Sequence, residues 1–86
     1  MEIYQLRYFA YAAKYENITM AAQELNVSQP SISKAIQSLE RELKTELLRK
    51  NGRSCVLTHD GYLLQERVVP LLEEIERLPL EFRNRQ

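Results

Sequence analysis

The chain of 86 residues has one cysteine, one histidine, no tryptophan and two glycines. The single cysteine, Cys55, rules out an intramolecular disulfide and favours a reducing, cytoplasmic setting. The single histidine, His59, has no cysteine, histidine or acidic cluster at ligand spacing, so the sequence offers no metal site. The sequence also lacks a glycine-rich phosphate loop and evident paired carboxylates, which leaves an enzyme as the least supported class.

The chain also lacks a long apolar run and an excess of charge. No apolar stretch is long enough to span a bilayer, and the first residues lack the basic and apolar regions of a signal peptide, so no membrane contact is expected. Lys and Arg together number 12, as do Asp and Glu, and a net charge of zero does not by itself indicate nucleic-acid binding. The charge is nevertheless uneven, because residues 28–53 hold six cations and three acids, whereas residues 54–86 hold four cations and six acids.

The most informative stretch is a helix predicted over residues 28–43. Ser28 is suited to cap its N-terminus and Pro30 to its first turn, where a missing N–H costs nothing. An apolar stripe with spacings of four, three and four consists of Ile32, Ile36, Leu39 and Leu43. Another side is polar and nearly free of acids, and consists of Gln29, Pro30, Ser33, Lys34 and Gln37. These groups suit base edges and phosphates in a DNA major groove, although a solvated face is the commoner meaning of such a pattern.

Two shorter helices are predicted before this one. Apolar spacing predicts the first over Ile3–Tyr15, with a tyrosine stripe along it: Tyr4, Tyr8, Tyr11 and Tyr15. These tyrosines either bridge core and solvent or contact another helix, and we expect the C-terminal helix, of this chain or of a partner, to lie there. Thr19 is the expected N-cap of the second helix, Met20–Asn26, and Asn26 replaces the usual turn glycine because asparagine tolerates positive φ. This order of elements predicts a helix-turn-helix.

A basic hairpin is predicted over residues 49–57. Asn51-Gly52 lies between two short strand-like runs, and both turn residues are expected at positive φ. The basic residues at or near its tip are Arg49, Lys50 and Arg53. A basic hairpin directly after a helix-turn-helix is typical of a wing, and Arg53 is a candidate for a narrow minor groove, although an ordinary cationic turn is the alternative. Cys55 is expected to pack inside this hairpin.

The last helix is expected to begin after Thr58, a suitable N-cap. Its heptad seam consists of Leu64, Val68, Leu71, Ile75, Leu78 and Phe82. Leu63 and Leu72 lie off this seam and are expected to pack on the rest of the chain. So small a domain cannot cover the whole seam, and a second copy of the chain is the simplest cover. Pro70 is expected to bend this helix, and Pro79 is a candidate for ending it.

Taken together, these residues resemble the N-terminal region of LysR-type transcriptional regulators. The resemblance covers about residues 3–65 and rests on Leu6-Arg7-Tyr8-Phe9, residues 18–25, residues 27–36, Leu39-Glu40, Leu47-Leu48, Gly52-Arg53, Leu57-Thr58 and Gly61. It implies a mainly α fold with a small β-hairpin: a winged helix-turn-helix over residues 1–58, then a dimerising linker helix over residues 59–86. It also implies a homodimer that binds A·T-rich double-stranded DNA of imperfect inverted-repeat symmetry at promoters.

The resemblance also implies roles for individual residues. Gln29, Pro30, Ser33 and Lys34 would meet bases or nearby phosphates, Thr19 and Ser31 would lie near the DNA backbone or groove edge, and Arg53 would reach the minor groove. With Gln37 and Lys50 these form the predicted DNA-binding set. No cofactor is expected in this domain, and a small-molecule effector is expected for a further domain outside this chain. A helical protein-interaction module without DNA binding stays open as the alternative.

Three positions depart from the pattern of that family. Lys44 stands where glycine is frequent, so the turn after the third helix is expected to differ. Leu48 stands where phenylalanine is frequent, which should alter only packing. Lys34 stands where arginine is common. Lysine lacks the planar guanidinium that forms bidentate hydrogen bonds with guanine, so we expect weaker base discrimination there.

Overall fold

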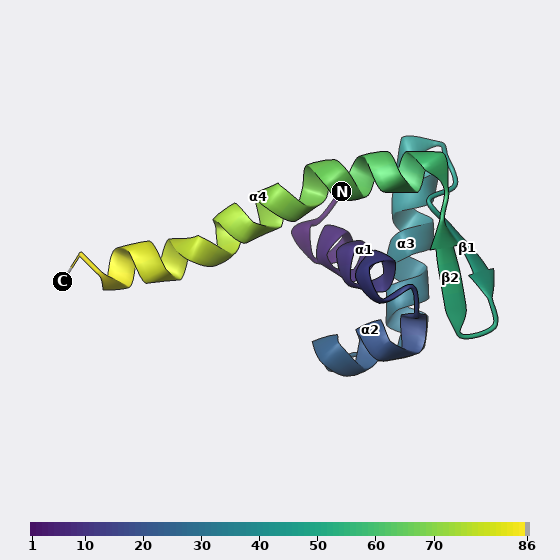
Figure 1. Cartoon of the computed structure of the whole chain (residues 1–86), viewed down its shortest axis with the longest axis horizontal. Coiled ribbons are helices and arrows are strands. Elements are labelled where there is room, and N and C mark those ends of the chain that lie inside the picture. The colour runs from purple at the N-terminus through teal and green to yellow at the C-terminus, as the bar shows by residue number, and fades with distance from the viewer. Residues whose placement is uncertain (86) are drawn as a thin grey trace.

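The computed structural model describes residues 1–85 of the chain. Within them the elements follow in the order α1 (Ile3–Tyr15), α2 (Ile18–Leu25), α3 (Gln29–Leu43), β1 (Leu48–Asn51), β2 (Ser54–Leu57) and α4 (His59–Arg83). The first three helices and the hairpin form one body, and α4 crosses this body before it extends away toward the C-terminus (Figure 1). The predicted winged helix-turn-helix followed by a long helix is therefore confirmed.

The core lies where α1, α2 and α3 meet. Phe9, Ile32 and Leu39 are each 0% exposed, and the small side chains of Ala12 and Ala21, also 0% exposed, allow the helices to approach closely. The predicted apolar stripe of α3 is therefore buried over most of its length.

Two leucines that were expected to be buried lie at the surface. Leu43 is 38% exposed and Leu63 is 49% exposed. Both border one shallow groove beside α4. Leu43 is the last residue of α3 and lies at the edge of the core, while Leu63 faces outward along α4, so the expected packing of these two side chains is wrong.

Left-handed residues end the first three helices, and α2 begins earlier than predicted. Asn17, not Thr19, caps α2, because its Oδ1 accepts the Met20 N–H at 2.9 Å. The prediction of positive φ at Asn26 is confirmed, with φ of 58°. Lys44 ends α3 with φ of 56°, so this turn adopts the left-handed conformation without the glycine.

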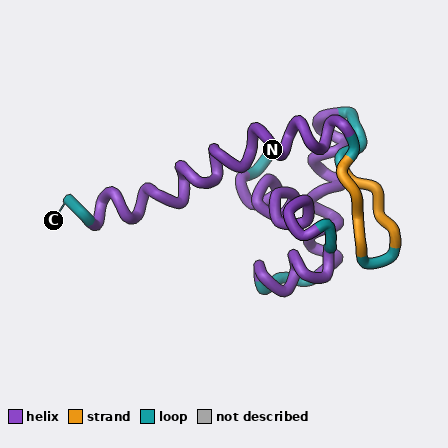
Figure 2. The backbone as a smooth tube through the Cα atoms, in the orientation of Figure 1, coloured by secondary structure: helices purple, strands orange, loops and turns teal. Residues whose placement is uncertain are grey.

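The hairpin forms where the sequence predicts it, but its turn is shifted by one residue. Asn51 pairs with Ser54, so Gly52 and Arg53 are the two turn residues. Among residues 48–57 only Gly52 has positive φ, at +66°, so the predicted turn with positive φ at Asn51 and Gly52 is wrong. Glycine at the first turn position is the preference of a type II′ hairpin. Figure 2 shows the hairpin projecting along one side of the helical body.

The second strand of the wing is fixed on its other edge by the connection between α1 and α2. The Cys55 N–H donates to the Glu16 carbonyl at 3.0 Å, and the Ile18 N–H donates to the Arg53 carbonyl at 3.1 Å. Cys55 is 1% exposed, as expected, and its Sγ lies 3.7 Å from the Ala12 carbonyl oxygen. Burial raises the pKa of the Cys55 thiol, which keeps it protonated and packed.

One carboxylate organises the loop between α3 and the wing. Glu40 Oε2 accepts the Leu47 N–H at 2.8 Å and the Leu48 N–H at 3.3 Å. Thr58 caps α4 as predicted, because its Oγ1 accepts the Gly61 N–H at 3.0 Å. The Thr58 N–H also donates to the Leu47 carbonyl at 3.0 Å, so hydrogen bonds hold together the end of α3, the start of β1 and the start of α4.

The long helix α4 continues through Pro70 and Pro79 to Arg83, so the suggestion that Pro79 ends it is wrong. Its first half packs on α1, where Leu72 is 6% exposed against Ala10. Within residues 1–85, no helix has both the length and the apolar character needed to cross a membrane.

The tyrosine stripe of α1 is not covered by α4, contrary to the expectation for this chain's own C-terminal helix. Tyr11 borders α4, beside Gln65, whose Nε2 donates to the Ala10 carbonyl at 3.1 Å. Tyr4 and Tyr8 border α3 instead. The reason is that α4 follows the Leu6 and Ala10 side of α1, which is more apolar.

Candidate nucleic-acid interface

The polar side of α3 is open to water. Gln29, Pro30, Lys34 and Gln37 are exposed, and Ser33 is half-buried, while the opposite side of the helix is buried. Ser28 caps the helix as predicted, with its Oγ accepting the Ser31 N–H at 3.2 Å. The predicted separation of α3 into a buried and an accessible side is therefore confirmed.

The wing contacts this polar side of α3 directly. Lys50 Nζ donates to Ser33 Oγ at 2.6 Å, so two predicted site residues from distant parts of the sequence lie together. Arg53 lies at the exposed turn, and its backbone is fixed by the bond to Ile18. Arg49 is less available because its Nε lies 2.6 Å from Glu46 Oε1. The wing therefore offers Lys50 beside α3 and Arg53 at its tip.

Two site residues taken from the resemblance lie at the edges of this surface. Ser31 is exposed, and its Oγ lies 2.8 Å from Ser28 Oγ. Thr19 lies in the first turn of α2 and is half-buried. Its Oγ1 is covered, and no hydrogen-bond partner for it is present among residues 1–85. The side chain of Ser31 is therefore more accessible to DNA than the side chain of Thr19.

The electrostatics of the surface favour an anionic ligand. Lys34, Lys50 and Arg53 have no carboxylate within 4.0 Å in the part of the chain that the structure describes. Arg41 shares this property, and it follows Gln37 by one helical turn on the same side of α3. Arg41 was not among the predicted DNA-binding residues, although its helical spacing from Lys34 and Gln37 places it on the same side of α3. No group of three potential metal ligands occurs among the described residues.

The heptad seam of α4 is divided by the structure into two parts. Val68 is 3% exposed and Leu64 is partly buried, both against α1, so their side chains are already covered within the chain. The later residues are uncovered: Leu71 is 57% exposed, Leu78 48% and Phe82 61%. The prediction that the whole seam faces a partner is therefore wrong for Leu64 and Val68, which pack against α1 of the same chain.

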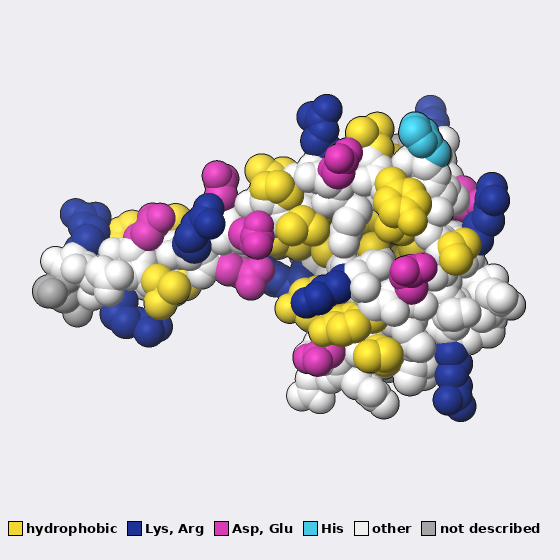
Figure 3. Space-filling view, in the orientation of Figure 1, with side chains coloured by type: hydrophobic (Ala, Val, Ile, Leu, Met, Phe, Trp, Pro, Cys, Tyr) yellow, Lys and Arg dark blue, Asp and Glu magenta, His cyan; other side chains and the backbone are white. Residues whose placement is uncertain are grey.

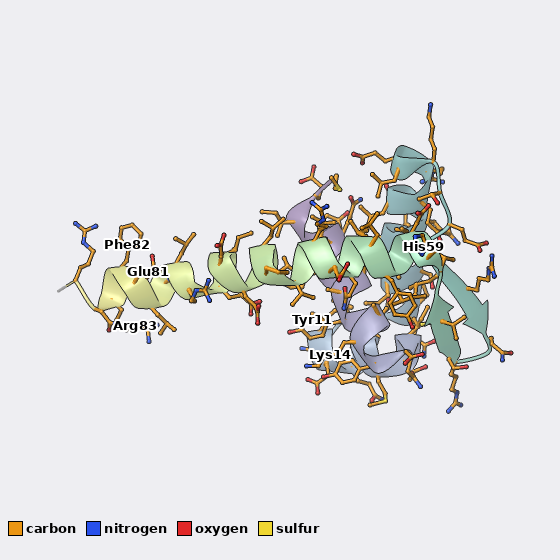
Figure 4. All side chains as sticks on the ribbon, turned by 45° about the horizontal axis from the view of Figure 1, so that its top comes forward. Tyr11, Lys14, His59, Glu81, Phe82 and Arg83 are labelled. Atoms are coloured by element: carbon orange, nitrogen blue, oxygen red, sulfur yellow. The ribbon has the colours of Figure 1, made fainter. Side chains whose placement is uncertain are left out.

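An apolar groove runs along this uncovered part of α4. It has a volume of about 450 Å³ and is bordered by Ile3 and Leu6 of α1 and by Leu71, Ile75 and Leu78 of α4. Figure 3 shows hydrophobic side chains gathered where α4 passes the body. Figure 4 shows Tyr11 and Lys14 beside the near part of α4, whereas Glu81, Phe82 and Arg83 lie at its far end, away from the body.

Comparison with protein families gives a match over residues 3–62 to the bacterial regulatory helix-turn-helix proteins of the lysR family. The chain is 40% identical over 78 residues to a probable cat1 operon transcriptional activator of Acinetobacter lwoffii, covering 91% of this chain and 26% of that protein. It is 49% identical over 61 residues to the regulator BudR of Raoultella terrigena, covering 71% of this chain and 21% of that protein. The chain thus spans about a quarter of the length of these relatives.

Solved structures similar to the chain include complexes with DNA. The DNA-binding domain of CbnR bound to DNA has a TM-score of 0.86 and 37% sequence identity, covering 98% of this chain and 97% of that one. The DNA-binding domain of BenM bound to benA site 1 DNA has a TM-score of 0.87 and 30% identity, covering 100% of both chains.

Proposed function

Because the chain belongs to the lysR family of bacterial regulatory helix-turn-helix proteins, we propose that it binds double-stranded DNA sequence-specifically as part of a transcription regulator in the cytoplasm. The observation that carries this proposal is the exposed, acid-poor side of α3, which opens beside the Lys50 contact of the wing. In this arrangement the first turns of α3 enter the major groove and the wing tip approaches the minor groove. Similarity to DNA complexes over nearly the whole chain supports it.

The same chain is proposed to act as a homodimer through α4. The uncovered apolar side chains of Leu71, Leu78 and Phe82 lie on the half of α4 that extends from the body. Apolar side chains at this spacing on a helix gain free energy when a second helix removes them from water. A two-fold dimer would present two α3 helices to two half-sites, so the proposed ligand is an imperfect inverted repeat. A·T-rich flanks are proposed because Arg53 at the wing tip suits a narrow minor groove.

Salt dependence provides a general check of this proposal. If each protomer neutralises about four phosphates, the logarithm of the association constant should fall with the logarithm of salt concentration at a slope of about −7. Selection from a random duplex library would supply the preferred duplex and its half-site spacing. Recovery of no preferred sequence would contradict sequence-specific binding.

Replacing Gln29 tests base reading by α3. Gln29→Ala should lower affinity for the selected duplex about 10-fold or more, because the side-chain amide can form two bonds to a base edge. Affinity for a scrambled duplex should stay the same, since no phosphate contact is lost. Fluorescence anisotropy measures both. Because Gln29 is exposed on α3, the urea midpoint should not change, and equal affinity of wild type and variant for the selected duplex would refute the assignment.

Replacing Arg53 tests the position of the wing. Arg53→Ala should weaken binding mainly on duplexes with A·T-rich flanks, whose narrow minor groove concentrates negative potential. Two duplexes with the same half-sites and either A·T-rich or G·C-rich flanks allow the comparison by anisotropy. An equal loss on both duplexes would argue against minor-groove insertion and for a simple phosphate contact.

The alternative, a helical interaction module without DNA binding, is not favoured by the comparisons. It predicts that the chain passes through a DNA or heparin column at low salt without retention. The proposal predicts retention at low salt and release at high salt, because phosphate contacts release counterions.

A further inference from the structure

A second polar surface adjoins the α3 face, in a groove between α1 and α3. The groove has a volume of about 320 Å³, and the hydroxyl-bearing or cationic side chains along it are Tyr4, Tyr8, Ser31, Lys34, Ser38 and Arg41. No carboxylate is among the described residues that line it. Ser31 and Lys34 also belong to the proposed DNA-binding face, so the groove opens directly onto that face.

Contacts with neighbouring side chains restrain three of the hydroxyl-bearing residues of the groove. Gln5 is 9% exposed, and its Oε1 accepts the Glu2 N–H at 3.0 Å while its Nε2 donates to Ser38 Oγ at 3.3 Å. Because the Ser38 oxygen accepts this bond, the hydroxyl proton of Ser38 is free to donate into the groove. Tyr4 and Tyr8 pack edge to face with ring centroids 5.4 Å apart, which limits their motion.

The two cations of the groove are free to bind an anion. Neither Lys34 nor Arg41 has a carboxylate within 4.0 Å among residues 1–85. Arg41 follows Lys34 by about two helical turns on the same side of α3, so both charges face one elongated site. Ammonium, guanidinium and hydroxyl donors around a concave surface are the groups that bind phosphate oxygens in protein–DNA complexes.

We propose that this groove binds a backbone phosphate of the duplex that α3 reads, with Lys34 and Arg41 as cations and Tyr8 and Ser38 as hydroxyl donors. The inference rests on the proposed function and deepens it, because it assigns Lys34 to positioning the duplex rather than to reading a base. A free phosphate ion shares this chemistry. The duplex is the chosen source because the groove is continuous with the base-reading side of α3 at Ser31 and Lys34.

The test compares Arg41→Gln and Tyr8→Phe with the matched control Arg77→Gln, which removes the same charge from an exposed position on α4. Anisotropy titrations of the whole chain use the selected and the scrambled duplex at several salt concentrations. Arg41→Gln should lower affinity about 10-fold on both duplexes and make the salt slope shallower by about 2 for a dimer, which has two copies of the site. Tyr8→Phe should lower affinity on both duplexes without changing the slope, and Arg77→Gln should change neither quantity.

The outcomes separate this inference from the proposed function. If Arg41→Gln keeps wild-type affinity and slope while Gln29→Ala weakens specific binding, the groove does not bind the duplex but the proposed function stands. If the wild-type chain binds neither duplex, both fail. A third outcome combines two results: inorganic phosphate shifts the amide resonances of Tyr8 and Ser38 saturably, and Arg41→Gln keeps the wild-type affinity for DNA. This outcome would show that the groove binds the free ion and not the duplex.

A modified duplex locates the contact. Single phosphates of the duplex are replaced by neutral methylphosphonates. At one position per half-site this replacement should lower the affinity of the wild type about 10-fold and should not lower the affinity of Arg41→Gln any further. Additive losses at every position would contradict a direct contact between Arg41 and a phosphate.

Discussion

Gly61→Ala is expected to destabilise the chain by about 3 kcal/mol, toward the upper end of the usual cost of overpacking. A Cβ atom at this position would lie 2.2 Å from the Leu47 carbonyl oxygen and 3.0 Å from Leu57 Cδ2. The Leu47 carbonyl cannot retreat easily, because it accepts the Thr58 N–H at 3.0 Å. Urea unfolding followed by circular dichroism measures the change in the free energy of unfolding.

Gly52→Ala is the matched control for this prediction. Gly52 has φ of +66°, and nothing lies within 4 Å of an added Cβ atom. The cost should therefore be only the strain of a left-handed alanine, about 1 kcal/mol. If the two variants were equally stable, the close approach of α4 to the Leu47 carbonyl would not be the reason for glycine at position 61.

Local signals in the sequence were sufficient for α1 and α3. The bounds Ile3–Tyr15 are those expected, and α3 begins after its Ser28 cap and ends before Lys44. These helices were predictable because an apolar stripe and, for α3, the Ser28 cap act within one or two turns of the chain. The accessible side of α3 followed from the same argument, since burial of the stripe fixes the rotation of the helix.

Features that depend on contacts between distant segments were less predictable. The turn of the wing is shifted because β2 also pairs with the connection at Asn17, which no local pattern reveals. Val68 was assigned to a partner because a heptad pattern does not tell which helix covers it, and α1 of the same chain does so. The acceptor role of Glu40 was not predicted, because it exists only once the loop to Leu47 has folded against the end of α3.

The candidate site shows the same division. The spacing of Gln29, Lys34 and Gln37 predicted that they share one side of α3, and all three are exposed there. The contact between Lys50 and Ser33 joins two segments 17 residues apart, and the sequence predicted only that both would be near DNA. The groove that Arg41 shares with Tyr8 required the packing angle of α1 on α3, which side-chain periodicity does not determine.

Leu71→Lys is expected to convert the dimer to monomers, raising the dimer dissociation constant by about 100-fold or more. Leu71 is 57% exposed and borders the apolar groove with Ile75 and Leu78, so a second copy that covers it would bury a lysine charge twice per dimer. The isolated chain should keep its fold, since the replaced side chain is already largely in water. Sedimentation velocity over a concentration series measures the association.

Leu63→Lys is the matched control, because Leu63 is 49% exposed on the same helix but lies in a different groove, beside Leu43. It should remain dimeric and bind the selected duplex as the wild type does. Leu71→Lys should lose most of its affinity for a duplex with two half-sites and keep its weak affinity for a single half-site, because only the dimer engages both half-sites at once. Dimers of Leu71→Lys with the wild-type dissociation constant would show that the chain associates through another surface.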